Sequence, residues 1–198
     1  MFARMALGEY EADGTPRDAD YVFTAMFDLL TSVANNIVAA SPDMKREDIL
    51  SLVGRTLFLR FLGDRGVVTA EHLAEIAPGG KKLEDCFSDG TKAARTCNWL
   101  DVTFNGDFLP LSERGSVDWF RRVAPKGGDV FKDLRAILRA EEPVGGGYQQ
   151  KLQFDWSTFD FAHVPVGLLS QVYEGFVWQW EPEEGKETSV VRHTDCVV

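Results

Sequence analysis

Histidine and cysteine, the side chains that most often carry nucleophilic or metal chemistry, are scarce in this sequence. Each occurs three times among 198 residues, and neither type is clustered. None of the histidines lies in a local signature with a nucleophile and an acid, so no catalytic triad is predicted. The cysteines are widely spaced and form no Cys-x-x-Cys motif, which argues against a disulfide scaffold or a zinc knuckle and fits a reducing compartment. The residues concerned are His72, His163, His193, Cys86, Cys97 and Cys196.

Basic residues are outnumbered by acidic ones. The sequence has 21 Lys and Arg against 31 Asp and Glu, and its formal net charge is -10. An acidic chain repels phosphate, so this chain alone is expected to bind duplex DNA poorly. The segments 79–82 and 145–147 are rich in glycine but lack the spacing of a phosphate-binding loop, and both are interpreted as turns or linkers.

Long apolar runs are also absent. Segment 29–42 is uncharged, but it is short and contains several polar residues, so it is not predicted to cross a bilayer. The first seven residues are too few for the apolar core of a signal peptide. We therefore expect a cytoplasmic protein without a membrane partner.

The residues that are present predict one mainly helical core. Hydrophobic residues make up 44% of the chain and aromatic residues 12%, which is enough to bury a core in a chain of this size. Apolar positions recur at helical spacing, with Thr69 as a cap and Gly66 as a left-handed stop. The predicted helices span about 18–40, a region starting at Ser41-Pro42-Asp43, 69–76, 130–140 and 165–180.

A small β element is expected in the middle of the chain. Asn105-Gly106 is a strong turn signal between apolar residues, so a strand or hairpin is predicted over 100–111, with a second short strand over 148–154. The segment 143–147 is interpreted as a flexible break. The predicted fold class is mainly α, with a two-stranded β element and a C-terminal linker helix. The predicted division is a flexible arm at 1–17, a helical domain at 18–180 and a charged linker at 181–198.

Three segments, in order, resemble one protein family. Arg55-Thr-Leu-Phe-Leu-Arg-Phe-Leu-Gly-Asp-Arg-Gly66 resembles a helix of the large adenine-specific DNA methyltransferases of type I, type IIG and phage-exclusion restriction systems. Phe104-Asn-Gly-Asp-Phe-Leu-Pro-Leu111 is similar to their F-N-G-D-L-F-P-L turn, with the middle pair exchanged. The most specific likeness is Phe159-Asp-Phe-Ala-His-Val-Pro-Val-Gly-Leu-Leu-Ser-Gln-Val-Tyr-Glu-Gly-Phe176, which resembles Y-D-F-S-x-I-P-V-E-L-L-S-x-I-Y-E-x-F, with Gly167 in place of the glutamate.

The resemblance implies a helical region that precedes a catalytic domain. In the family, a D-P-x-C-G-S-G loop beneath S-adenosylmethionine and an N-P-P-Y loop that holds the flipped adenine follow this region. No two prolines are adjacent in this sequence, so it contains no N-P-P-Y motif. His193-Thr194-Asp195 stands where the family has Tyr-Thr-Pro. We therefore expect a chain cut off before the catalytic domain, with no catalytic, cofactor-binding or metal-binding residue; S-adenosylmethionine would belong to the missing domain.

The same resemblance suggests two sets of interaction residues and one main function. Arg55, Arg60 and Arg65 are candidate contacts to the DNA backbone within a full assembly. The aromatics of the last helix, Tyr173, Phe176, Trp178 and Trp180, surround much of its girth and are candidates for an interface with the catalytic domain or restriction-modification subunits. The alternative, that these aromatics close the domain's own core, stays open.

The expected function is a non-catalytic module that scaffolds the methyltransferase domain and frames the DNA cleft. The alternative is a stand-alone acidic regulator that docks on a restriction-modification complex, since an acidic surface can occupy a DNA cleft.

Overall fold

The computed structural model describes residues 19–104, 109–124, 128–139, 142–144, 147–149 and 166–180. The predicted arm at 1–17 and the predicted linker at 181–198 lie outside these residues. The described chain is mainly helical, as predicted. Its elements are α2 (Ala19–Ala40), α3 (Arg46–Asp64), α4 (Ala70–Ile76), η1 (Leu83–Phe87), α5 (Gly90–Phe104), η3 (Ser112–Gly115), α6 (Val117–Val123), α7 (Gly128–Arg139), β1 (Glu142–Val144), β2 (Gly147–Gln149) and α8 (Val166–Trp180).

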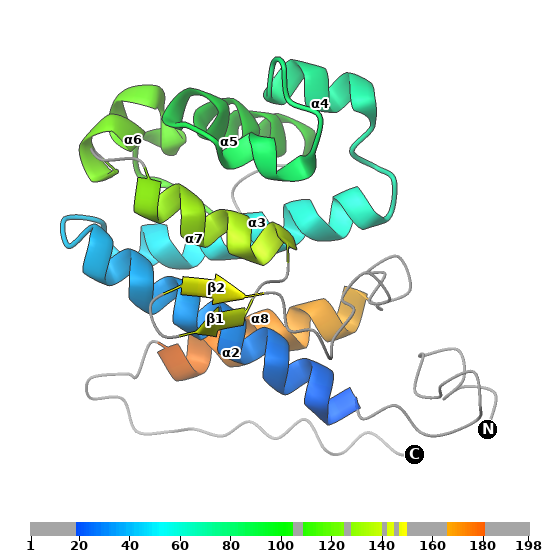
Figure 1. Ribbon diagram of the computed structural model, residues 1–198, viewed down its shortest axis with the longest axis vertical. Coiled ribbons are helices and arrows are strands. Elements are labelled where there is room, and N and C mark those ends of the chain that lie inside the picture. Colours follow the sequence, from blue (N-terminus) through cyan, green and yellow to red (C-terminus); the bar gives the residue numbers. More distant parts are fainter. Residues whose placement is uncertain are drawn as a thin grey trace, which may run out of the picture.

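Two helices occupy the middle of the molecule. In Figure 1, α3 and α7 cross the centre, with α4, α5 and α6 on one side and α2, α8 and the β-ribbon on the other. The central position of α3 is reflected in its burial, because most of its residues, polar ones included, are removed from solvent. One continuous apolar cluster connects the helices, and Val33, Ile37, Ile49, Leu52, Leu134 and Phe176 are among its most buried members.

The end of α3 and the start of α4 follow from local sequence, as predicted. Gly66 adopts φ +69°, and its N–H donates to the Gly63 carbonyl at 2.9 Å. The N–H of Val67 donates to the Leu62 carbonyl at 2.9 Å, which completes a Schellman motif. Thr69 then caps α4 by accepting a hydrogen bond from the His72 N–H at 3.3 Å.

The predicted start of the second helix is wrong. Ser41 is buried, and its N–H donates to the Ile37 carbonyl at 2.8 Å, so it ends α2 instead of capping α3. The N–H of Met44 donates back to the Ser41 carbonyl at 3.0 Å, which places Pro42 within a turn. The next helix, α3, begins at Arg46.

The predicted strand or hairpin at 100–111 is also wrong in its described part. Residues up to Phe104 are helical, in α5. Ala93, Cys97 and Leu100 lie at helical spacing and are buried, while Val102 is exposed, so the apolar residues follow a helical face. The turn Asn105-Gly106 lies outside the described residues. The helices α5 and α6 and the 3-10 turn η1 were not predicted.

The only strands in the described ranges are β1 and β2. They pair antiparallel, with Pro143 opposite Tyr148, and α2 contacts β1. This ribbon is not the predicted hairpin, and it includes residues from the segment 143–147 that was interpreted as a break. The strand predicted over 148–154 coincides with β2 only at Tyr148 and Gln149, and 150–154 lie outside the described residues.

Candidate functional site

Arg55, the first predicted DNA contact, lies inside the molecule. Its side chain comes from the middle of α3 and the residue is only 3% exposed. The Nε atom donates to the carbonyl oxygen of Leu109 at 2.8 Å, and Nη1 donates to that of Cys97 at 3.1 Å. The Nη2 atom pairs with the carboxylate of Asp101. The prediction of a DNA contact is therefore wrong for Arg55, because its guanidinium is buried and holds three acceptors of the fold.

The other two predicted arginines are in different surroundings. Arg60 is half-buried; its Nε pairs with the Asp64 carboxylate at 2.8 Å, and its Nη1 donates to the carbonyl of Leu138. Arg65 is exposed, and its guanidinium carbon lies 4.4 Å from the centre of the Phe61 ring. The structure therefore does not gather Arg55, Arg60 and Arg65 into one solvent-facing set. Of the three, only Arg65 lies in the exposed class.

Three of the four predicted interface aromatics face the chain's own core. Phe176 is completely buried and Trp180 is nearly so. The indole Nε1 of Trp180 donates to the Asn35 side chain at 2.9 Å, and the Arg46 guanidinium carbon lies 4.7 Å from the centre of its ring. Tyr173 is partly buried, and its hydroxyl donates to the Leu50 carbonyl at 3.2 Å. Trp180 and Tyr173 attach α8 to α2 and α3, and Phe176 belongs to the shared apolar core.

Trp178 differs from its three neighbours because 71% of its surface is exposed. It lies on α8, on the side turned away from the core positions Phe176 and Trp180. An exposed tryptophan is the side chain most often found at the energetic centre of a protein interface. Trp178 is therefore the only exposed member of the predicted set.

The three segments that carry the family resemblance meet at Gly54 and Arg55. The Leu109 carbonyl accepts from Arg55, as described above. A Cβ atom added to Gly54 would lie 2.6 Å from Cε2 of Tyr173 and 3.1 Å from Cδ1 of Leu109. Glycine is therefore required at position 54 for α3, the 109–111 segment and α8 to approach this closely.

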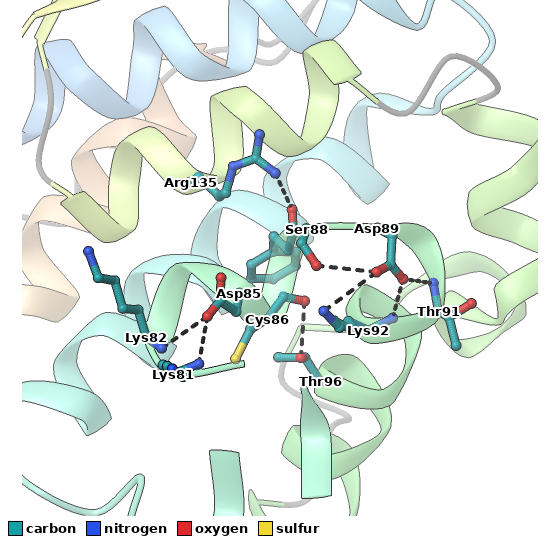
Figure 2. Close-up of polar contacts among 11 residues, drawn as sticks. Lys81, Lys82, Asp85, Cys86, Ser88, Asp89, Thr91, Lys92, Thr96 and Arg135 are labelled. Atoms are coloured by element: carbon teal, nitrogen blue, oxygen red, sulfur yellow. Dashed lines mark hydrogen bonds and ion pairs between the residues drawn. The ribbon is translucent and has the colours of Figure 1, made fainter. Parts of the chain in front are cut away.

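A second candidate site is a hollow between η1 and α7. It has a volume of about 660 Å³, and the charged residues that line it are Lys81, Lys82, Glu84, Asp85, Arg135 and Arg139. Figure 2 shows Asp85 next to the Lys81–Lys82 segment, with Arg135 reaching from α7 to η1. This contact is a hydrogen bond of 2.9 Å from Nη1 of Arg135 to the Phe87 carbonyl. This hollow was not predicted from the sequence.

Both carboxylates of the hollow have partners. Asp85 accepts the backbone N–H groups of Lys81 at 2.7 Å and Lys82 at 3.0 Å. These two bonds, in that order, lower the pKa of Asp85 against the smaller effect of its burial, so the carboxylate is ionised at neutral pH. Glu84 pairs with Nε of Arg139 at 3.6 Å.

The described part of the molecule offers little other chemistry. It contains no group of three or more His, Cys, Asp or Glu side chains that could hold a metal ion. The cysteines of this region, Cys86 and Cys97, are buried, and burial raises their pKa values to about 11 and about 12, so neither is a reactive thiolate. His72 lies in the first turn of α4, and its Nδ1 is 3.0 Å from the carbonyl oxygen of Val67, just before the helix.

Within the described ranges no helix is both long and apolar enough to cross a membrane.

Comparisons of the chain with protein-family models, with curated proteins and with solved structures find no match.

Proposed function

We propose that this chain is a non-catalytic helical module of a restriction-modification adenine-specific DNA methyltransferase. In this role it packs on the methyltransferase domain and helps to frame the DNA cleft. The helix α8 acts as the linker helix toward that domain. The catalytic residues, and the site for S-adenosylmethionine, belong to the methyltransferase domain, and DNA is bound only by the full assembly in the cytoplasm.

One observation carries the proposal: the three family-like segments meet at one place. Arg55 and Leu109 are 54 residues apart and share a buried hydrogen bond. Tyr173 of the third segment donates a partly buried hydrogen bond to the carbonyl of Leu50, which lies on α3 just before the first segment. The Arg55 hydrogen bond joins the first segment to the second, and the close approach of Tyr173 and Leu109 to Gly54 brings the third beside them. Their convergence supports a resemblance of architecture, in which Gly54 and Arg55 join α3, the 109–111 segment and α8.

The exposure of Trp178 indicates the side of α8 on which the partner domain is proposed to bind. The opposite side of α8 is committed to the core through Phe176 and Trp180, so a domain that follows α8 would meet the side that carries Trp178. Burial of a tryptophan side chain removes a large apolar area from water and can contribute more than about 2 kcal/mol to binding. Arg65, which is exposed at the C-cap of α3, remains a proposed contact to the DNA backbone in the assembly.

The test combines this chain with the catalytic domain of a type IIG or phage-exclusion adenine methyltransferase from which the helical region has been removed. Binding is measured by titration calorimetry, and transfer of a labelled methyl group from S-adenosylmethionine to DNA is measured with each component alone and with both. We expect no transfer by this chain alone, a stable complex, and higher transfer by the complex than by the catalytic domain alone.

The matched variants are Trp178→Ala and Val102→Ala. Both positions are exposed apolar residues, at 71% and 79%, on different helices. Trp178→Ala is expected to weaken the complex by about tenfold or more, and Val102→Ala to leave it unchanged. Methyl transfer by this chain alone, or the absence of any complex, would overturn the proposal. A complex in which methylation is inhibited would instead identify an acidic regulator.

A further inference from the structure

We propose that the hollow between η1 and α7 binds a small anion with two or more adjacent phosphate groups, of the class of pyrophosphate and the nucleoside di- and triphosphates. This inference does not depend on the methyltransferase proposal. It follows from the local charge, from the way in which both carboxylates are held, and from the size and shape of the hollow.

The local charge is opposite to that of the whole chain. The chain carries a net charge of -10, yet four of the six charged side chains that line the hollow are cationic. Lys81 and Lys82 come from the segment before η1, and Arg135 and Arg139 lie one helical turn apart on α7. Cationic side chains from two separate elements can together attract a multiply charged anion.

The carboxylates of Glu84 and Asp85 do not cancel the positive charge of the four basic side chains that line the hollow. Glu84 is within 3.6 Å of Arg139 and offsets one guanidinium. Both backbone bonds to Asp85 fall on the same oxygen, Oδ2, and stabilise its charge, with smaller electrostatic attractions to the side chains of Lys92 and Lys82. Among the described residues, the ammonium groups of Lys81 and Lys82 take part in none of the ion pairs. Two lysine ammonium groups, with three donors each, therefore remain for a ligand, and the lining of the hollow also includes Arg135, whose Nη1 donates to the Phe87 carbonyl.

The size of the hollow and the net charge of the chain favour a compact ligand over a nucleic-acid strand. A volume of about 660 Å³ is within the usual range of small-molecule sites, roughly 300–1,000 Å³. A long strand would extend beyond the hollow across a surface of a chain with net charge -10, which repels its phosphates over about a Debye length of 10 Å. A pyrophosphate group is small enough to keep all of its charge within the hollow.

The test measures binding of pyrophosphate, ADP and ATP to the full chain by titration calorimetry at low and high salt, with adenosine and inorganic phosphate for comparison. We expect pyrophosphate and the nucleotides to bind more tightly than inorganic phosphate, adenosine not to bind, and affinity to fall as salt rises. The double variant Lys81→Gln/Lys82→Gln should weaken binding by about tenfold or more, since each removes a charge-assisted hydrogen bond.

The double variant should retain the fold, because Asp85 accepts the backbone N–H groups of residues 81 and 82 and not their side chains. Thermal unfolding checks this, and Lys45→Gln, at an exposed position outside the lining, serves as the matched control. Failure of pyrophosphate and ATP to bind at millimolar concentration would overturn the proposal. So would equal binding by the folded double variant, or tighter binding of single-stranded DNA than of ATP through the same two lysines.

Discussion

The Nε atom of Arg55 donates a hydrogen bond of 2.8 Å to the carbonyl oxygen of Leu109, and both residues are buried. Arg55 also holds Cys97 and Asp101 of α5, so one guanidinium connects α3 to two other parts of the chain. A buried cation without partners is very costly, so loss of Arg55 or of its acceptors is expected to destabilise the fold.

Arg55→Met is expected to lower the free energy of unfolding by about 3 kcal/mol or more, because it leaves two buried carbonyls and the Asp101 carboxylate without their donor. Urea denaturation measures this change. Arg65→Met is the control, since Arg65 is exposed and its guanidinium lies over the Phe61 ring, and it should cost less than about 1 kcal/mol. Equal effects of the two variants would contradict the assignment of Arg55 to the core.

Gly54→Ala is expected to destabilise the protein by about 1–3 kcal/mol, because the new Cβ would lie 2.6 Å and 2.9 Å from two atoms of the Tyr173 ring. In the Tyr173→Ala background the added penalty should largely disappear, since the ring is gone; a double-mutant cycle in urea measures this coupling. Gly167→Ala in α8 is the matched control, because an added Cβ there meets nothing within 4 Å, and it should be neutral or slightly stabilising. Additive effects of Gly54→Ala and Tyr173→Ala would show that α3 and α8 do not meet here.

Asp85→Ala is expected to lower stability by about 1 kcal/mol at pH 7, as for loss of a helix cap. The pKa of Asp85 is lowered in the folded state by the backbone N–H groups of Lys81 and Lys82. Its contribution is therefore fully present above the unfolded carboxyl pKa of about 3.9 and is lost as the pH falls through the lower folded value. The difference in unfolding free energy between wild type and variant should shrink below pH 4. Asp118→Ala, which removes an exposed ion pair with Arg121, should change stability by less than about 0.5 kcal/mol. A difference that persists unchanged to pH 2 would be incompatible with a charged cap.

Cys86 and Cys97 are expected to be inert towards a disulfide reagent at pH 8 in the native protein. Burial raises their pKa values to about 11 and about 12, so almost no thiolate is present to react. The measurement uses Cys196→Ser, because Cys196 lies outside the described residues. We expect no reaction of the folded variant and reaction of two thiols after unfolding in guanidinium. Rapid labelling of the folded variant would show that one of the two sites opens to solvent.

The sequence correctly predicted those helices and caps that depend only on residues close to each other along the chain. The apolar spacing of α2 places Val33 and Ile37 on its buried side, as predicted. Gly66 and Thr69 were identified as stop and cap because a positive φ and a capping hydroxyl depend on neighbouring backbone alone. The strand predicted around Val102 was wrong because a short run of apolar residues does not reveal the longer helical face of α5 to which the run belongs.

The candidate sites depended on contacts between distant segments. Arg55 looked like a surface arginine because its acceptors, at positions 97, 101 and 109, are far along the chain. The four basic residues of the hollow likewise come from two segments more than fifty positions apart, and an overall charge of -10 concealed their grouping.

The sequence by itself determined that the chain is mainly helical, where α2 and α8 lie and how α3 ends, because hydrophobic spacing and backbone conformation act over a few residues. Only the tertiary structure decided which arginine is buried, which aromatic of α8 remains exposed and where positive charge collects. Burial and electrostatic grouping depend on what a side chain meets after the chain has folded, and those neighbours come from segments that the local pattern does not connect.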